Sequence, residues 1–370
     1  MMSDKTIRVL VVDDSPLMRA LICDAIATVD DMQVVGQATD GIEALAKFKE
    51  LQPDVVTLDI QMPRRNGLET LQDLLACRAL PVLMCSSLTT FGAEITLTAL
   101  EQGALDYVAK PESGRVGNEL LRDELIRKLR LIAGADVRRI LEIRRKRQAN
   151  RPQRDPVSAL THTLSAQKAI SDQAGKVIAL GISTGGPPAL HHLFEHLQGP
   201  LPPLVIVQHM PKHFTKSLAG RLDRLGPIRC KEAESGDVLQ PNHAYLAPGG
   251  MHLSLERGPS GPRCVVSFSD LVSGHRPSID VLMTSAAELF KAKCLGVIMT
   301  GMGRDGVAGC SFIRKHGGFV LGQDEETSDV YGMNRVAMNE GHVDEQFALD
   351  NVATTIMAYA RQMGGTVAAV

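Results

Sequence analysis

The sequence contains no tryptophan, and aromatic residues make up only 4% of its 370 residues. Its seven cysteines show no CxxC spacing, which argues against a disulfide framework and a zinc ribbon and favours small buried thiols in a reducing compartment. No apolar run reaches the roughly 20 residues of a membrane span, and no signal-peptide pattern is found. The formal net charge of −2 gives no general attraction for nucleic acid or anionic membrane. We therefore expect a cytoplasmic protein that does not insert into a membrane.

The length and an ordinary hydrophobic content of 44% predict about two domains, each with its own core. Strands alternate with helices in both halves, which predicts an α/β fold with parallel sheets. We predict one domain over residues 1–125, a helical and then flexible basic linker over 126–175, and a second domain over 176–364. The basic run 144–154 has no aromatic residues for base stacking and no recognition helix after it, so we predict a solvated linker and no nucleic-acid partner.

Charged and hydroxyl residues follow the predicted strands of the first domain. Because the carboxyl ends of parallel strands share one edge of a sheet, these side chains can meet there. A single aspartate after a strand is more often a helix cap or turn former, but capping does not account for a set of five. Clustered carboxylates repel one another unless a cation binds, and their oxygen ligands suit Mg²⁺. The five residues are Asp13, Asp14, Asp59, Ser86 and Lys110.

This first third resembles the receiver domain of two-component response regulators, which implies a flavodoxin-like fold with a five-stranded parallel sheet. On that resemblance Asp59 is the phosphoacceptor, and Ser86 and Lys110 contact the phosphoryl oxygens. Tyr107 matches the aromatic switch position. These residue types suit that reaction, because a carboxylate can attack phosphorus in line while a cation neutralises the charge around it. The implied Mg²⁺ ligands are Asp14, Asp59 and the backbone carbonyl of Gln61, with Asp13 assisting through water.

The second domain opens with an apolar run, 177–182, that stops at Ser183 within the sequence Gly-Ile-Ser-Thr-Gly-Gly. A helical pattern with proline near its first turn follows over 187–197. A strand that turns sharply into a helix at a serine describes a nucleophile elbow. The same stretch is equally typical of a tight turn whose serine caps the next helix. Taken alone, the motif favours neither interpretation.

Two further buried runs place a histidine and an aspartate at strand ends. The run 204–208 leads into His209, and the run 294–300 opens into a loop that contains Asp305. In a parallel sheet these two residues can meet Ser183 at one edge, as nucleophile, base and orienting acid. The chain order Ser, His, Asp differs from that of α/β-hydrolases, so we predict another doubly wound, mostly parallel sheet. Short strands within 238–255, joined by a glycine turn, predict an antiparallel hairpin.

Three other patterns compete with this interpretation. The loop 301–306 spells GxGxxG after a strand, which is typical of dinucleotide binding but belongs in a first βαβ unit. His192 and His196 are one helical turn apart, but without an obvious third ligand we interpret them as surface histidines. A rival serine–histidine–aspartate set lies close together before a helix, which favours capping or a pocket wall. That set is His275, Ser278 and Asp280.

The second domain resembles the catalytic domain of the chemotaxis protein-glutamate methylesterases. The matching motifs include residues 181–186, 208–211, 247–250, 274–278, 300–306 and 331–333. The resemblance implies Ser183 as nucleophile, His209 as general base and acid, and Asp305 as its orienter. Thr184 and the loop around Met302 would line the site, and the Met302 N–H would stabilise the oxyanion.

The two resemblances together imply a phosphorylation-activated serine hydrolase that gives sensory adaptation. Its substrates would be glutamate γ-methyl esters, and specific glutamines, of methyl-accepting chemoreceptors. The phosphodonor would be the chemotaxis histidine kinase, Mg²⁺ would be needed only in the receiver, and the catalytic domain would use no cofactor. The alternative is a phosphorylation-switched protein that binds a nucleotide or partner without catalysis. A DNA-binding output is disfavoured, because no helix-turn-helix pattern follows the receiver.

Overall fold

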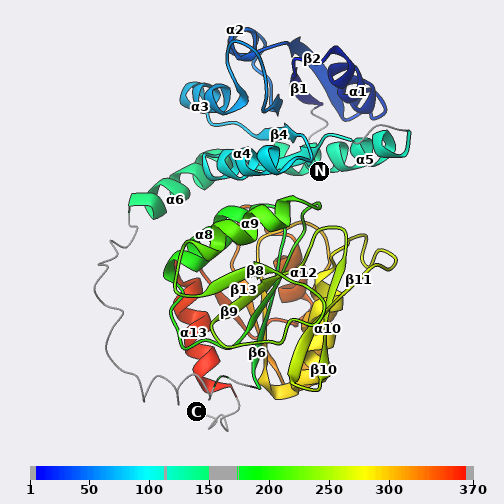
Figure 1. Cartoon of the computed structure of the whole chain (residues 1–370). Coiled ribbons are helices and arrows are strands. Elements are labelled where there is room, and N and C mark those ends of the chain that lie inside the picture. The colour runs from blue at the N-terminus through cyan, green and yellow to red at the C-terminus, as the bar shows by residue number, and fades with distance from the viewer. Residues whose placement is uncertain (1–5, 112–114, 150–172, 174, 364–370) are drawn as a thin grey trace. The chain divides into compact units, whose positions relative to one another are not determined.

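The computed structural model describes residues 6–111, 115–149, 173 and 175–363. The chain forms two compact units, Met1–Arg145 and Lys146–Val370 (Figure 1). The predicted linker, 126–175, contains the end of α5 and all of α6, while most of its basic and polar remainder lies outside the described residues. Within the described part of the chain, no helix combines the length and the apolar character needed to span a bilayer.

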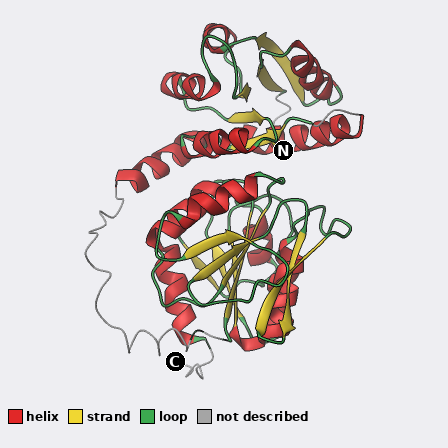
Figure 2. Cartoon of the chain, in the orientation of Figure 1, coloured by secondary structure: helices red, strands yellow, loops and turns green. Residues whose placement is uncertain are grey.

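The first unit is a five-stranded parallel sheet with helices around it (Figure 2). The strand order is β2-β1-β3-β4-β5, which confirms the predicted fold. The strands β1, β3 and β4 are almost entirely apolar and buried, as expected when helices cover both faces of a parallel sheet. The strands are β1 (Ile7–Val12), β2 (Met32–Ala38), β3 (Val55–Asp59), β4 (Val82–Ser86) and β5 (Asp106–Ala109). The helices are α1 (Pro16–Ala27), α2 (Gly41–Leu51), α3 (Gly67–Cys77), α4 (Thr90–Glu101), α5 (Arg115–Ala133) and α6 (Val137–Ala149).

The second unit is built on a seven-stranded parallel sheet with the order β14-β13-β12-β6-β7-β9-β8. Its strands are β6 (Val177–Ile182), β7 (Leu204–Gln208), β8 (Arg229–Glu232), β9 (His243–Leu246), β12 (Cys294–Ile298), β13 (Phe319–Gln323) and β14 (Glu345–Phe347). The helices are α8 (Gly186–His196), α9 (Phe214–Asp223), α10 (Ile279–Phe290), α11 (Val307–Lys315), α12 (Met333–Asn339) and α13 (Val352–Gln362). The neighbouring strands β12, β6 and β7 occupy the middle of the sheet, and their carboxyl ends share one edge.

An antiparallel hairpin of β10 (His252–Gly258) and β11 (Gly261–Ser267) forms a separate two-stranded sheet. The predicted hairpin exists, but its predicted position within 238–255 is wrong. The short strands in that range are β9 and the start of β10, and they do not pair, because β9 joins the parallel sheet beside β7. Helix α10 packs against β6 and β12 and also against β10, so it connects the large sheet to the hairpin.

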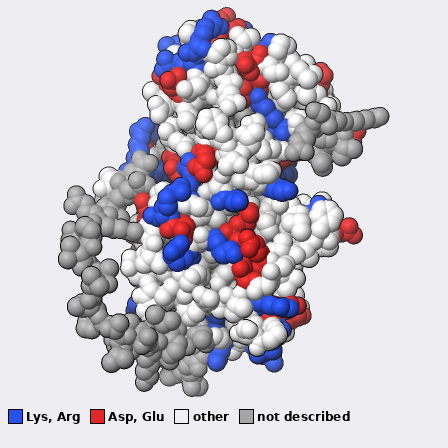
Figure 3. All heavy atoms as spheres, in the orientation of Figure 1, with Lys and Arg blue, Asp and Glu red and all other residues white. Residues whose placement is uncertain are grey.

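Side chains of both charge signs lie on the surface. On the face shown in Figure 3, Lys and Arg side chains are interspersed with Asp and Glu side chains among uncharged residues. This mixture agrees with the near-neutral formal charge of the sequence.

Candidate active site

Ser183 lies at the point where β6 ends and the chain turns into α8. The turn is closed by a hydrogen bond of 2.8 Å from the Gly186 N–H to the Ser183 carbonyl. Gly185 has a φ of 79°, which a residue with a side chain rarely adopts, and it is the N-cap residue directly before α8. The N-cap of α8 is Gly185 and not Ser183, whose hydroxyl instead faces the imidazole of His209. The turn therefore has the geometry of the elbow and not that of a serine cap.

The loop that follows β12 contacts this serine closely. The Ser183 N–H donates to the Thr300 carbonyl at 2.9 Å. A Cβ atom added to Gly301 would lie only 2.6 Å from the Ser183 Cβ, so only glycine permits this approach. The elbow and the loop before Asp305 are thus fixed to one another through backbone contacts.

His209 connects Ser183 to Asp305 by two hydrogen bonds. Its Nδ1 lies 3.1 Å from the Ser183 Oγ, and its Nε2 lies 2.8 Å from the Asp305 Oδ2. Asp305 is fully buried, while the Ser183 residue is 9% exposed and His209 is half-buried. With the proton on Nε2, the imidazole donates to the carboxylate and presents a lone pair to the hydroxyl. This is the arrangement that a serine nucleophile needs, because its free hydroxyl barely ionises at neutral pH.

The Asp305 carboxylate is held at the amino-terminal end of α10. It accepts hydrogen bonds from the Ser278 hydroxyl at 2.7 Å and from the N–H groups of Ile279 at 2.7 Å and Asp280 at 3.1 Å. Burial acts to raise the pKa of Asp305, but the hydrogen bonds and charge of His209 and the bonds from Ser278 and Ile279 outweigh it and lower that pKa. The positive end of the helix dipole favours the same ionised form. Asp305 therefore remains a carboxylate facing the imidazole.

A second buried carboxylate, that of Asp280, lies beside the first, and its pKa is shifted in the opposite direction. Burial, together with the charge of Asp305, raises the pKa of Asp280. Its side chain accepts hydrogen bonds from the N–H groups of Gly306 at 2.9 Å and Gly309 at 2.8 Å, and from the Ser273 hydroxyl at 2.9 Å. Asp280 thus fixes the loop around Asp305 without contacting His209. Two members of the rival set, Ser278 and Asp280, are therefore supports of Asp305 in this arrangement.

The third member of that set, His275, lies against the imidazole of His209. Its ring is parallel to the His209 ring, with an interplanar angle of 6° and a centroid separation of 3.9 Å. This contact was missed from the sequence, because 66 positions separate the two residues and no local pattern joins them. His252 was also missed: its Nε2 pairs with the Asp270 carbonyl at 2.9 Å, and its Nδ1 accepts the Ser278 N–H at 3.3 Å.

Gln208 belongs to the motif 208–211, and the sequence predicts no separate role for it. Its Nε2 donates to the carbonyl of Ser183 at 3.0 Å and to that of His209 at 3.3 Å, so it fixes the elbow to the strand that carries the histidine. Its position directly before His209, at the end of a buried strand, is a signal that could have found it. The amide nitrogen of a side chain buried there finds its hydrogen-bond acceptors within the site.

The two predicted site-lining residues also lie at this edge of the sheet. Thr184 is buried, and its carbonyl accepts a hydrogen bond from the Thr300 hydroxyl at 3.0 Å. Met302 directly follows Gly301, the residue in contact with Ser183. The GxGxxG pattern over 301–306 belongs to this same loop. Because Asp305 points from it toward His209 and α10, a pyrophosphate there would meet a buried carboxylate.

In the first unit, the predicted phosphoacceptor site also lies at the carboxyl edge of the sheet. The Lys110 Nζ lies 2.8 Å from the Asp13 Oδ2 and 2.8 Å from the Asp59 Oδ1. Carboxylate oxygens of Asp13, Asp14 and Asp59 lie within 4.8 Å of one another, and only Asp14 is exposed. Burial raises the pKa of Asp59 to about 6, with Lys110 opposing and Asp13 adding to the shift. A divalent cation would offset that cost, so these residues fit a metal site.

The remaining predicted receiver residues occupy the neighbouring strand ends. Ser86 ends β4, is buried and accepts a hydrogen bond of 2.7 Å from the Thr96 hydroxyl. Gln61 lies in the turn after β3 and is exposed. Tyr107 is buried in β5, with the Lys128 Nζ 4.6 Å from its ring centroid. Lys128 was missed from the sequence, where it is one of many charged residues in a helical pattern.

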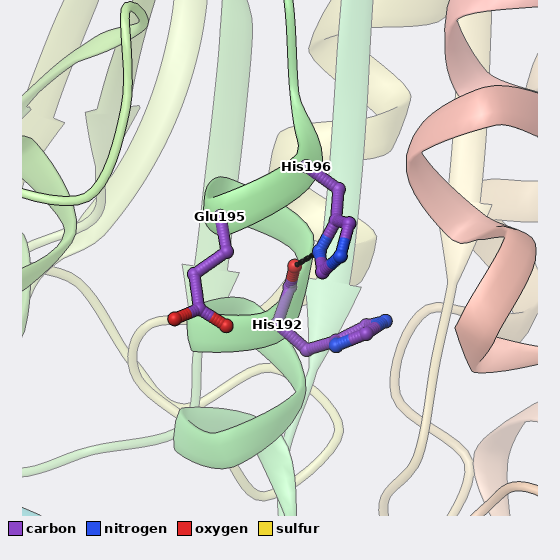
Figure 4. Close-up of side chains that lie close together, drawn as sticks. All are labelled: His192, Glu195 and His196. Atoms are coloured by element: carbon purple, nitrogen blue, oxygen red, sulfur yellow. Dashed lines mark hydrogen bonds between the residues drawn. The ribbon is translucent and has the colours of Figure 1, made fainter. Parts of the chain in front are cut away.

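The histidine pair on α8 has a carboxylate neighbour after all. Potential ligand atoms of His192, Glu195 and His196 lie within 4.8 Å of one another, which corrects the expectation that no carboxylate is near. Figure 4 nevertheless shows Glu195 pointing away from the two imidazoles, and its carboxylate lies 3.3 Å from the Nε2 of His191. The His196 Nδ1 bonds to the His192 carbonyl at 2.8 Å. A zinc-type ion lies within about 2.2 Å of each of its ligand atoms. A carboxylate that points away from the two imidazoles does not meet that condition, so we assign no metal site here.

The comparisons with known proteins agree with both halves of the structure. A family model described as CheB methylesterase matches residues 178–356, and one described as response regulator receiver domain matches residues 9–121. The chain is 44% identical to the protein-glutamate methylesterase/protein-glutamine glutaminase 1 of Caulobacter vibrioides, over 96% of this chain and 98% of the relative. It is 42% identical to the protein-glutamate methylesterase/protein-glutamine glutaminase of Chromohalobacter salexigens, over 98% of this chain and 99% of the relative.

A similar solved structure is the CheB methylesterase catalytic domain of Thermotoga maritima. The sequence identity is 37%, and the match covers 50% of this chain and 99% of that one with a TM-score of 0.49. The two relatives match this chain over nearly their full lengths at more than 40% identity. The chain therefore belongs to the CheB methylesterase family, as a member that joins a response regulator receiver domain to the methylesterase domain.

Proposed function

We propose that this protein is a phosphorylation-controlled protein-glutamate methylesterase, also active as a protein-glutamine deamidase, whose catalytic residues are Ser183, His209 and Asp305. The esterase activity is supported by membership of the CheB methylesterase family. The assignment of residues is supported by one observation, the imidazole of His209 lying within hydrogen-bonding distance of both Ser183 and Asp305. The alternative of a switched binding protein without catalysis has no support from the relatives.

The hydrogen bonds suggest how the reaction runs. The His209 Nδ1 takes the Ser183 proton as the Oγ attacks the ester carbonyl, and Asp305 stabilises the resulting imidazolium through Nε2–H. The imidazolium returns the proton to the departing methoxide, which leaves as methanol. His209 then removes a proton from water, which attacks the acyl-enzyme and releases the glutamate carboxylate. With glutamine the leaving group is ammonia. We assign the oxyanion donor to the Met302 N–H, with Thr184 lining the site.

The receiver half of the proposal assigns Asp59 as the phosphoacceptor. Its carboxylate attacks phosphorus, while Ser86 and Lys110 contact the phosphoryl oxygens and Tyr107 acts as the switch residue. When bound, Mg²⁺ would neutralise charge around the transferred phosphoryl group. Lys110, now 2.8 Å from both Asp13 and Asp59, would move its charge toward the new dianion. The proposed Mg²⁺ ligands are Asp13, Asp14, Asp59 and the backbone carbonyl of Gln61.

The proposal extends to partners and organisation. We assign methyl-accepting chemoreceptors as the substrate and the chemotaxis histidine kinase as the phosphodonor, in the cytoplasm. We retain the predicted division into a receiver over 1–125, a linker over 126–175 and a catalytic domain over 176–364. In this scheme phosphorylation of the receiver increases hydrolysis by the catalytic domain.

The experiment that tests this function measures methanol released from methylated chemoreceptor by the full chain, with and without a small phosphodonor such as acetyl phosphate. We expect release in both cases, with a faster rate when the phosphodonor is present. The absence of methanol under both conditions would contradict the esterase assignment. Release at one unchanged rate, despite phosphorylation detected by mass spectrometry, would contradict the control by the receiver.

A further inference from the structure

Large apolar side chains are exposed next to the active site. Among the described residues of the second unit, the exposed large hydrophobics are Phe268, Leu271, Val272 and Met338. Three of them fall within five positions, with exposed fractions of 72% for Phe268, 60% for Leu271 and 37% for Val272. Single exposed apolar residues are ordinary, but a cluster of them beside a catalytic site indicates an interaction surface. We call Phe268, Leu271 and Val272 the apolar patch.

The loop that carries the apolar patch is held in place by several contacts. The Arg276 guanidinium lies 3.9 Å from the centre of the Phe268 ring and donates to the Ser269 carbonyl at 2.6 Å. The backbones of Val272 and His275 exchange two hydrogen bonds, of 2.9 and 3.2 Å. A loop whose backbone is fixed in this way presents its apolar side chains with a smaller ordering cost on binding.

The same loop reaches the catalytic residues by two routes. His275, whose backbone pairs with that of Val272, stacks on the His209 ring. The Asp270 carbonyl pairs with His252, which accepts the N–H of Ser278, and Ser278 donates to Asp305. The apolar patch therefore belongs to the segment that forms one wall of the site. A polypeptide whose glutamyl ester reaches Ser183 must cover surface close to this wall.

We propose that the apolar patch is the docking surface for the polypeptide substrate, and that it fits a segment presenting an apolar side chain next to the glutamyl ester or glutamine. This inference rests on the proposed function. The reacting groups themselves offer little to recognise, because a methyl ester and a carboxamide are small and uncharged and share only a carbonyl. Affinity for a protein substrate must therefore come from the surrounding surface, where an uncharged partner is matched by apolar side chains.

The test compares two variants of the full chain, assayed with saturating phosphodonor and again without it. Phe268→Ser combined with Leu271→Ser removes most of the patch, and Met338→Ser, which is 40% exposed on α12, is the matched control. Each is assayed with methylated chemoreceptor and with a small soluble ester, N-acetylglutamate γ-methyl ester. We expect the double variant to lower kcat/KM for the receptor about tenfold or more, through KM, as loss of interface anchors does. Its small-ester rate, and both rates of the control, should stay within about twofold of the parent protein.

Each other outcome overturns the inference in a distinct way. Unchanged receptor kinetics would show that the substrate does not use the patch. A rise in both rates without phosphodonor would show that the patch contacts the chain's own receiver instead. A parallel fall in both rates would show that the loop supports His209 and does not recognise the receptor. If the parent protein hydrolysed neither substrate, the proposed function itself would fail, and this inference with it.

Discussion

The two parallel sheets of this protein carry polar residues at the same kind of edge, but in different electrostatic states. In the receiver, two buried carboxylates, Asp13 and Asp59, share one ammonium group from Lys110, and the pKa of Asp59 is raised to about 6. In the catalytic domain, the carboxylate of Asp305 has four hydrogen-bond donors, and its pKa is lowered. The first edge retains negative charge beyond its one ammonium group, whereas the two carboxylates of the second edge, Asp305 and Asp280, are stabilised by hydrogen bonds from the chain itself.

This difference fits the two kinds of chemistry that we propose for these edges. A site that must accept a cation and a phosphoryl group benefits from charge that its own side chains leave uncompensated. A serine hydrolase site benefits from groups already fixed in position, because reorganisation during the reaction would add to the barrier. We therefore expect the receiver edge to depend on added ions and the catalytic edge to depend on its internal hydrogen bonds.

The largest effect is expected from Asp305→Asn. Loss of the carboxylate removes the charge that orients His209 and stabilises its imidazolium, so methanol release should fall about 10³- to 10⁴-fold. The control is Asp280→Asn, a buried neighbour that does not contact His209, which should cost less than about tenfold. Equal losses in the two variants would show that Asp305 has only a structural role.

A smaller effect, confined to regulation, is expected from Asp59→Asn. The amide cannot accept a phosphoryl group, so stimulation by phosphodonor should disappear while basal methanol release stays within about twofold. Removal of Mg²⁺ with EDTA should have the same result on the parent protein. The measurement is the ratio of methanol release with and without acetyl phosphate. A loss of basal activity on chelation would mean that the catalytic edge also needs a metal.

The stacked ring of His275 should contribute a moderate effect on turnover. His275→Ala removes the surface that fixes the His209 ring, and we expect kcat for a small ester to fall about tenfold with little change in KM. His275→Phe keeps a flat ring in place and should recover most of that loss. The pH profile of kcat checks the role of the imidazole itself. A phenylalanine variant as slow as the alanine variant would contradict a positioning role based on stacking.

The smallest expected effect is on the free energy of unfolding and concerns His192 on α8. Burial and the neighbouring His196 lower the pKa of His192 to about 4, against about 6.5 in an unfolded chain. The native state thus favours the neutral form of His192. The contribution of this residue to the free energy of unfolding is therefore complete above about pH 6.5 and is lost as the pH falls through about 4. Denaturant unfolding of His192→Gln should show a shallower loss of stability between these pH values. A pH dependence identical to that of the parent protein would exclude this titration.

Much of the fold and of both sites could be predicted because the information is local. Buried runs that end at Ser183, His209 and Asp59 are visible in sequence, and parallel strands bring their ends to one edge. The hairpin was misplaced because β9 and β10 look alike locally, and only tertiary pairing assigns β9 to the large sheet. The stack of His275 on His209 depends on how the loop before α10 folds back, which no local spacing encodes.

The most direct test of the account is methanol release from methylated chemoreceptor by Ser183→Ala, with and without a small phosphodonor. Because the proposed nucleophile supplies the acyl-enzyme step, we predict a loss of at least about 10³-fold under both conditions. Phosphorylation of Asp59, followed by mass spectrometry, should remain as in the parent protein. Hydrolysis retained by this variant at a comparable rate would remove Ser183 from the mechanism and contradict the account.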